Sequence, residues 1–168
     1  MAAYRSEPLD ERQDLSSFES GAPALDEWLR RSALHTQRMR TARTFVWIRE
    51  RRTVVAYYSF AAHLGVREEL PDRIARGSPD RIPSILLARL ALDRALQGQG
   101  LGEQLLLDAL SRAVAASDAA GARIVIVDAI DERAGGFYEH YGFTPVPGQP
   151  LRLVRKISDI AKALGFNS

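Results

Sequence analysis

The chain has 168 residues, of which 46% are apolar, 23 are basic and 21 are acidic. This length suits one domain, and the mixture of apolar and charged residues excludes a disordered or low-complexity chain. There is no cysteine, which excludes disulfides, a thiolate nucleophile and a Cys-ligated metal site. No uncharged stretch reaches the roughly 18 apolar residues of a membrane-spanning helix. Because residues 1–20 also lack the apolar core of a secretory signal, we expect a cytoplasmic protein with no membrane partner.

The charge is unevenly distributed along the chain. Residues 1–27 carry two Arg and seven acidic residues, whereas residues 28–94 carry fourteen Arg and six acidic residues. Arginine binds phosphate in a bidentate way, so the basic middle third is a candidate nucleic-acid surface, with Arg38, Arg40 and Arg43 as its densest cluster. An ordinary solvated face is the alternative, and composition alone does not decide between them.

The first half of the chain predicts a helix followed by a hairpin. Apolar residues at helical spacing predict a helix over 25–39. The β-branched and aromatic runs 43–49 and 53–62, separated by the charged residues 50–52, predict two antiparallel strands. The polar stretch 64–81 predicts a long connection with room for one short helix.

The second half alternates strands and helices. Residues 83–92 and 123–129 are almost continuously apolar, which is typical of parallel strands buried on both faces. A long helix is expected between them, beginning at Leu101 and ending at Ala120-Gly121. The remaining expected elements are a helix over 132–141 with Asp131 as its N-cap, strands over 143–146 and 151–156, and a short helix in the tail. Together with the hairpin, this order predicts an α/β domain with a mixed sheet.

Three glycines occur in the segment Gln97-Gly98-Gln99-Gly100-Leu101-Gly102, where the first long helix begins. Glycine lets the backbone adopt positive φ and approach a ligand, and the first N–H groups of a helix lack partners within it. Such a helix start favours a bound anion, so this loop is a candidate phosphate cradle. A plain tight turn is the alternative, because the spacing is neither that of the P-loop nor that of the full dinucleotide motif.

A second candidate segment is the helix that contains Gly135, Gly136 and Tyr138. Each glycine costs about 1 kcal/mol relative to alanine inside a helix, which suggests close approach of a ligand or a neighbouring element. Tyr138 offers a phenol that could protonate a leaving thiolate. A core tyrosine with a satisfied hydroxyl is the alternative.

These segments resemble the GNAT N-acetyltransferase superfamily, whose acetyl-CoA motif is matched in order by Gln97, Gly100 and Gly102. The resemblance narrows to the acetyltransferase toxins of type II toxin-antitoxin modules and covers nearly the whole chain. It is carried by residues 82–93, 97–102, 127–129 and 137–143, together with 18–21, 25–29, 43–46 and 56–59. The resemblance implies one GNAT domain over residues 1–168, an α/β fold with a mixed, mostly antiparallel central sheet flanked by helices.

The activity that the resemblance implies is acetyl transfer from acetyl-CoA to the α-amine of the aminoacyl group on charged tRNA, which blocks translation. Tyr138 then matches the catalytic tyrosine that protonates the departing thiolate. The implied acetyl-CoA site comprises Leu90, Ala91, Leu92, Gln97, Gly98, Gln99, Gly100, Leu101, Gly102 and Phe137. The candidates for binding tRNA phosphates are Arg38, Arg40, Arg43, Arg81 and Arg89.

The resemblance further implies a cognate DNA-binding antitoxin, a homodimer and chemistry without a metal. Two alternatives stay open: an acetyltransferase acting on a protein N-terminus or a small amine, and a CoA-binding protein without turnover. The sequence also leaves open a catalytic role for His63 or Asp128, while His35 and His140 are expected to be structural or surface residues. The connection 64–81 is the expected contributor to amino-acid specificity.

Overall fold

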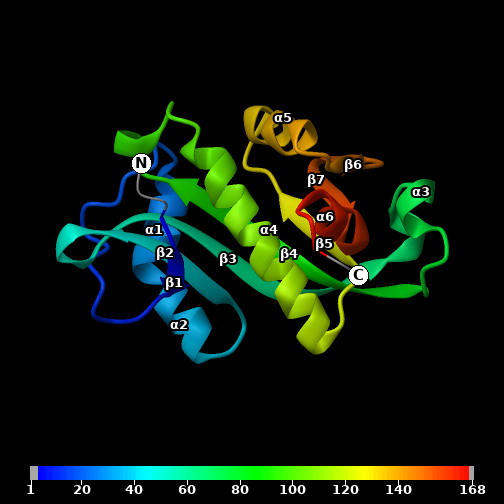
Figure 1. Cartoon of the computed structure of the whole chain (residues 1–168), viewed down its shortest axis with the longest axis horizontal. Coiled ribbons are helices and arrows are strands. Elements are labelled where there is room, and N and C mark those ends of the chain that lie inside the picture. The colour runs from blue at the N-terminus through cyan, green and yellow to red at the C-terminus, as the bar shows by residue number, and fades with distance from the viewer. Residues whose placement is uncertain (1–3, 167–168) are drawn as a thin grey trace. The chain divides into compact units, whose positions relative to one another are not determined.

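The computed structural model describes residues 4–166. Its seven strands form a sheet in the order β1-β2-β3-β4-β5-β7-β6 (Figure 1). The strands are β1 (Ser6–Pro8), β2 (Arg43–Arg49), β3 (Thr53–Val66), β4 (Arg81–Leu92), β5 (Ile124–Asp128), β6 (Thr144–Val146) and β7 (Gln149–Lys156). The helices are α1 (Pro23–Arg31), α2 (Ala33–Arg38), α3 (Asp72–Ala75), α4 (Leu101–Ala120), α5 (Glu132–His140) and α6 (Ile157–Ala163).

The sheet mixes the two strand directions. The pairs β1–β2, β2–β3, β5–β7 and β6–β7 are antiparallel. β4 and β5 are parallel, with residues 84–87 opposite residues 124–127. The prediction of an α/β fold with a mixed, mostly antiparallel sheet flanked by helices is therefore confirmed.

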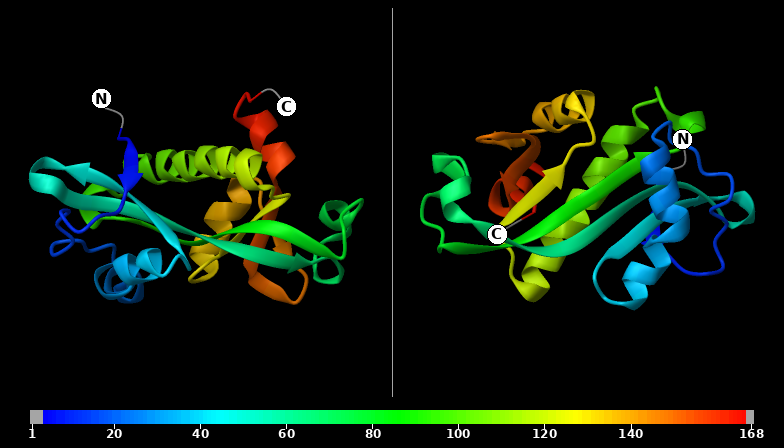
Figure 2. Two further views of the ribbon diagram at one scale, coloured as in Figure 1. Left: turned by 90° about the horizontal axis from the view of Figure 1, so that it is seen from below. Right: turned by 180° about the vertical axis from the view of Figure 1, so that it is seen from behind.

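The chain forms two compact units, residues 1–61 with 89–109 and residues 62–88 with 110–168. The first unit contains β1, β2, α1 and α2 together with the N-terminal half of α4, and α1 and α2 lie on the other side of its strands from α4 (Figure 2). Its core includes Phe18, Leu29, Val46 and Tyr57, which are almost completely buried. β3 is buried at every position from Val54 to Phe60, so both faces of this strand lie in the interior.

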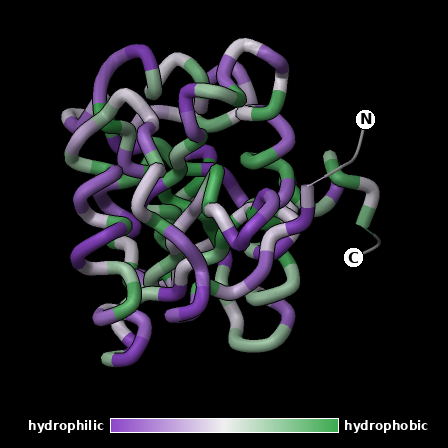
Figure 3. Tube along the Cα trace, turned by 90° about the vertical axis from the view of Figure 1, so that its left-hand side faces the viewer, coloured by the Kyte–Doolittle hydropathy of each residue, from purple (hydrophilic) through white to green (hydrophobic). Residues whose placement is uncertain are grey.

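The second unit is organised around β5. Residues 124–127 are fully buried, and β5 is an interior strand that pairs with β4 at one edge and with β7 at the other. Ile74, Ile82 and Val154 complete this core, and both α5 and α6 contact β7. In Figure 3 many hydrophobic residues lie toward the middle of the trace, whereas many of its outer turns are hydrophilic. The predicted buried parallel strand over 123–129 is thus confirmed.

Three features of the first half differ from the predictions. The helix expected over 25–39 is interrupted at Ser32, whose φ of −120° departs from helical values. No glycine or proline marks this break, so the sequence pattern did not reveal it. β3 continues to Val66 rather than ending at residue 62. β1, with three residues, was not predicted because so short a strand has no recognisable periodicity.

Gly65 explains why β3 can continue through the start of the predicted connection. A Cβ on Gly65 would lie 3.2 Å from Ser84 Oγ and 3.6 Å from the carbonyl oxygen of Ile82. Glycine therefore permits close approach of the neighbouring strand segment. The remainder of the connection contains one short α-helix, α3, as predicted.

Candidate active site

The glycine loop between β4 and α4 is fixed at its base by hydrogen bonds. The side-chain amide of Gln97 donates to the carbonyl oxygens of Leu92 and Ser20, at 2.8 and 2.7 Å. The carboxylate of Asp93 accepts a hydrogen bond of 3.0 Å from Ala95 N and so caps the turn that leads into the loop. Gln97 thus uses its amide to anchor the loop, a structural role that the sequence motif did not specify.

The two central glycines of the loop have left-handed backbone conformations. Gly98 has φ of +79° and Gly100 has φ of +78°, values that favour glycine over residues with a Cβ. Both are exposed, and a Cβ built on either would have no neighbouring atom within 4 Å. The loop therefore leaves open space beside the backbone where α4 begins at Leu101. Because unpaired N–H groups at a helix start attract anions, this arrangement fits a diphosphate.

The other residues predicted to bind acetyl-CoA in this loop have different environments. Gln99 is exposed and donates a 3.2 Å hydrogen bond to the carbonyl oxygen of Ala95. The side chain of Leu101 is buried, and Gly102 lies half-buried in the first turn of α4. Because its side chain is buried, Leu101 can contact a ligand only through its backbone.

The C-terminal part of β4 is less covered than predicted. Ala91 is buried, but Leu90 and Leu92 are only half-buried. The parallel register with β5 ends at Leu87, so it does not include residues 90–92. A strand whose pairing stops before its end has backbone groups that can pair with an extended ligand such as pantetheine.

Tyr138 is held in place by α5 and by its aromatic neighbours. Asp131 begins this helix as predicted, accepting a 2.8 Å hydrogen bond from Ala134 N. The Tyr138 ring makes edge contacts with Phe137 and Phe143, at centroid distances of 5.5 and 5.8 Å. Only 5% of the residue is exposed. No hydrogen bond of its hydroxyl is present among residues 4–166, and since no fully buried side-chain oxygen there lacks a partner, this oxygen keeps some accessible surface.

The surroundings of Tyr138 favour its neutral form. Burial raises the pKa of the Tyr138 phenol above its ordinary value, and the negative charge of Asp128 raises it further. A phenol in this environment keeps its proton at neutral pH and can donate it. The predicted cofactor contact Phe137 is half-buried on the same helix.

The double glycine of α5 is not explained by tight packing. A Cβ on Gly135 would make ordinary contacts of 3.9 and 4.0 Å with Ala129 and Leu151. A Cβ on Gly136 would have no neighbour within 4 Å. Neither glycine is therefore required by a close neighbouring element of the chain.

Asp128 and the histidines have the following positions. Asp128 forms a two-point ion pair with Arg152 on β7, which indicates a structural role for its carboxylate. His63 is half-buried on β3, while His35 and His140 are exposed on α2 and α5. Within residues 4–166, no three His, Cys, Asp or Glu side chains form a group suited to a metal ion.

The five arginines predicted to bind tRNA differ in exposure. Arg38, Arg40 and Arg43 are exposed and close together in the chain of the first unit, and Arg81 is exposed at the start of β4. Arg38 lies 3.4 Å from Glu11, an exposed ion pair of little energetic weight. Arg89 is different because it is half-buried and its guanidinium lies 4.0 Å from the centroid of the Trp28 ring. The sequence did not single out Trp28, because no local pattern connects two residues so far apart.

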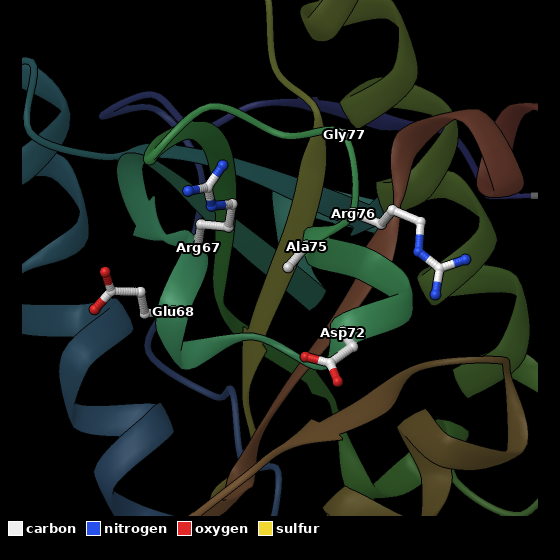
Figure 4. Close-up of a pocket in the computed structure, with 6 residues that line it drawn as sticks. All are labelled: Arg67, Glu68, Asp72, Ala75, Arg76 and Gly77. Atoms are coloured by element: carbon white, nitrogen blue, oxygen red, sulfur yellow. The ribbon is translucent and has the colours of Figure 1, made fainter.

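A hollow in the predicted specificity connection is lined by charged residues of both signs. Arg67 and Glu68 lie on one side of α3 and Arg76 on the other (Figure 4). Arg67 forms an ion pair of 2.6 Å with Asp80 and donates a 3.0 Å hydrogen bond to the carbonyl oxygen of Ser78. These bonds hold the two ends of the connection together.

A second hollow was not predicted from sequence. It lies beside the glycine loop in the first unit and is lined by Arg5, Arg49 and Arg51 together with Gln99 and Leu101. Arg51 has φ of +59°, an uncommon conformation for a non-glycine residue.

No helix in the described part of the chain is long and apolar enough to cross a membrane.

Comparison with known proteins identifies the class to which this fold and glycine loop belong. Residues 41–145 match the model of the acetyltransferase (GNAT) domain. The chain belongs to this family and is an acetyltransferase.

The chain is similar to several toxins. It is 40% identical to a "tRNA-acetylating toxin" of Mycobacterium tuberculosis, with 94% of each chain covered. Among solved structures it is similar to AtaT complexed with acetyl-methionyl-tRNAfMet, with a TM-score of 0.87, 32% identity and coverage of 95% of this chain and 98% of AtaT. It is also similar to a tyrosine-to-phenylalanine mutant of AtaT bound to acetyl-CoA and the C-terminus of the antitoxin AtaR, with a TM-score of 0.82, 29% identity and coverage of 96% and 98%.

Proposed function

We propose that this protein is the toxin of a type II toxin-antitoxin module and acetylates charged tRNA. It transfers the acetyl group of acetyl-CoA to the α-amine of the aminoacyl group and thereby blocks translation. The observation that carries this proposal is 40% identity to a tRNA-acetylating toxin over 94% of both chains. The similarity to AtaT with acetyl-methionyl-tRNAfMet supports the same acceptor class.

The acetyl donor is bound by backbone groups in this proposal. Residues 97–102 hold the pyrophosphate of acetyl-CoA through backbone N–H groups at the start of α4, with the exception of the Gln97 N–H, which donates to the carbonyl oxygen of Arg94. The backbone of Leu90, Ala91 and Leu92 pairs with the pantetheine arm and steadies the thioester carbonyl. The positive φ of Gly98 and Gly100 supports the assignment of the pyrophosphate to the loop. The end of the β4–β5 register at Leu87 supports the assignment of the pantetheine arm to the end of β4.

The chemical step is direct attack by the aminoacyl amine on the thioester carbonyl. A carbon–nitrogen bond forms, the carbon–sulfur bond breaks, and the amine loses a proton to water. The amine of an aminoacyl ester is less basic than a lysine side chain, so a substantial fraction is neutral near pH 7 without a strong base. Positioning the amine beside the thioester supplies much of the acceleration.

Tyr138 donates its hydroxyl proton to the departing coenzyme A thiolate. Its raised pKa keeps the phenol protonated until that moment, and its lack of a hydrogen-bond acceptor among the described residues leaves the proton available. A positioned general acid contributes roughly 10²- to 10⁴-fold to a reaction of this kind. The tyrosine-to-phenylalanine mutant of AtaT is consistent with a functional tyrosine in this group of toxins.

The acceptor is held through its phosphates. Arg38, Arg40 and Arg43 form one exposed basic cluster for the tRNA backbone, and Arg81 and Arg89 provide further contacts. Binding that depends on several such contacts weakens steeply as salt concentration rises.

The partners of the protein follow from the same relatives. AtaT is described with the C-terminus of an antitoxin and acetyl-CoA, so we propose a cognate DNA-binding antitoxin for this chain. We further propose a homodimer in the cytoplasm, where charged tRNA is available.

A cell-free translation system tests the proposal. The purified protein should stop translation when acetyl-CoA is added and should have no effect with free coenzyme A. Mild alkaline hydrolysis of the recovered tRNA should then release an N-acetyl amino acid. Continued translation with acetylation of a ribosomal or other protein N-terminus would instead support a protein acceptor.

A further inference from the structure

Arg89 belongs to a stack of side chains built on α1, β3 and β4. Its guanidinium carbon lies 4.0 Å from the centroid of the Trp28 ring. Trp28 in turn stacks on Tyr57, at a centroid distance of 6.0 Å and an interplanar angle of 15°. The Tyr57 hydroxyl donates a 2.7 Å hydrogen bond to the carbonyl oxygen of Leu25, which fixes the stack against α1. Arg89 is therefore held in one place rather than free on the surface.

The charge of Arg89 has no acidic partner in the part of the chain that the structure describes. None of the ion pairs or side-chain hydrogen bonds within residues 4–166 involves its guanidinium. Asp26, the buried acid of α1, accepts its hydrogen bonds from the backbone and hydroxyl of Ser20, at 2.6 to 3.2 Å. Burial lowers the pKa of Arg89 from its ordinary value, as expected for a cation that has lost water without gaining a counter-ion.

The geometry of the stack leaves the donors of Arg89 available. A guanidinium is planar, and a cation–π contact uses its face. Its five N–H groups point outward in the plane, where they match the oxygens of a phosphate. Trp28 thus positions Arg89 for binding an oxyanion instead of neutralising it.

The place of Arg89 on β4 indicates which substrate supplies that anion. Arg89 and Ala91 share one face of the strand because side chains alternate, and Ala91 packs into the core formed with α1. Along the chain, residues 90–92 separate Arg89 from the glycine loop. If those residues hold the thioester and the loop holds the pyrophosphate, Arg89 lies beyond the thioester, away from the phosphates of acetyl-CoA. The anion must then come from the acceptor.

We infer that Arg89, positioned by Trp28, binds the phosphodiester nearest the aminoacyl group at the 3′ end of the charged tRNA. This inference rests on the proposed function, because it assigns a contact to the acceptor of that reaction. It distinguishes Arg89 from the exposed Arg38, Arg40, Arg43 and Arg81, which in the proposed function contact other phosphates of the tRNA. Trp28 is a positioning residue that acts through Arg89.

Two acceptor substrates, one with and one without a phosphodiester, test whether Arg89 binds that group. One is an aminoacylated CCA trinucleotide, which contains the phosphodiester. The other is aminoacyl-adenosine, which contains no phosphate. Arg89→Gln should lower kcat/KM about tenfold or more for charged tRNA and for the trinucleotide, the loss typical of a charge-assisted contact. It should change kcat/KM for aminoacyl-adenosine less than twofold.

Further variants distinguish the loss of Arg89 positioning from a general loss of structure. Trp28→Leu should reproduce the Arg89→Gln pattern, whereas Trp28→Phe and Arg89→Lys should retain part of the activity. Arg31→Gln is the matched control, because Arg31 lies on the same helix as Trp28, is exposed and forms an ion pair with Glu27 one turn away. It should leave both acceptors unaffected. The slope of log kcat/KM against log salt should fall by about 0.7 in Arg89→Gln, as for one lost phosphate contact to a single strand.

Acetyl-CoA affinity and the thermal unfolding midpoint show whether each variant keeps its donor site and its fold. Equal losses for the trinucleotide and for aminoacyl-adenosine in a folded Arg89→Gln protein would overturn the phosphate contact. Unchanged kcat/KM on both would overturn it as well. Absence of transfer by the wild-type protein to any charged tRNA would overturn the proposed function itself, and this inference with it.

Discussion

Asp128 and Arg152 face each other across the antiparallel β5–β7 pair and form a two-point ion pair. Arg152 Nε lies 2.8 Å from Oδ1 of Asp128, and Arg152 Nη2 lies 2.9 Å from Oδ2. The pair fixes the end of β5 shortly before the chain enters the helix of Tyr138. Since Asp128 also raises the pKa of Tyr138, this structural carboxylate influences the candidate catalytic phenol.

Replacing Asp128 by asparagine should lower the pKa of Tyr138 relative to the wild-type protein. Removing the negative charge makes the phenolate less unfavourable, while burial still holds the pKa above its ordinary value. The free energy of unfolding should fall by about 1 kcal/mol or less, because the Asp128 and Arg152 side chains are 42% and 29% exposed. Tyrosine titration by NMR measures the first effect, with the exposed Asp118→Asn as control. An unchanged Tyr138 titration would disprove the electrostatic coupling.

Tyr138→Phe should reduce kcat for acetyl transfer by about 100-fold or more, because it removes the proton donor. Stability should change little, since the ring contacts with Phe137 and Phe143 remain and the hydroxyl has no partner within residues 4–166. Steady-state kinetics and thermal unfolding measure the two effects. Tyr141→Phe on the neighbouring turn should retain activity. Full activity of Tyr138→Phe would refute the general-acid role.

High pH should destabilise the protein through the buried tyrosines Tyr57 and Tyr138. Burial raises the pKa of both Tyr57 and Tyr138 above the ordinary value of 10.0. The unfolded chain therefore loses phenolic protons first, and the stability that the neutral phenols contribute below pH 10 is lost as pH rises beyond it. Denaturant titrations between pH 8 and 11 should show this decline, and Tyr138→Phe should reduce it. A decline identical in the variant would argue against a raised pKa at Tyr138.

Glycine-to-alanine substitutions should have opposite effects in the loop and in α5. Gly100→Ala places a side chain at φ of +78° and should cost about 1 kcal/mol of stability while weakening acetyl-CoA binding. Gly136→Ala enters open space within a helix and should increase the free energy of unfolding by about 0.5–1 kcal/mol. Chemical denaturation and calorimetric titration with acetyl-CoA provide the readouts. Unimpaired acetyl-CoA binding by Gly100→Ala would speak against the phosphate cradle.

The sequence predicted the elements whose residues repeat a clear pattern. α4 and β5 were found because long apolar periodicity and a continuous buried run are strong signals. The Asp131 cap and the positive φ of the loop glycines also follow from residue chemistry. β1 and the break at Ser32 could not be predicted, because neither carries a periodicity or a helix-breaking residue.

The candidate site was predicted less completely than the fold. Cofactor binding by Gln97 stays a prediction, and the hydrogen bonds by which its side chain anchors the loop to Leu92 and Ser20 were not expected from the motif. The stacking of Arg89 on Trp28 depends on how α1 packs against β4, which local sequence does not contain. Such contacts between distant parts of the chain distinguish a preorganised arginine from a solvated one.

The most direct test of the account is transfer of radiolabelled acetyl from acetyl-CoA to tRNA. Purified protein should label a charged tRNA pool, and the label should be absent from uncharged tRNA, from free amino acids and from reactions with Tyr138→Phe. Hydrolysis should release the label as one or a few N-acetyl amino acids. A protein that binds acetyl-CoA yet places no label on charged tRNA, while acetylating a small amine or a protein N-terminus, would contradict the account.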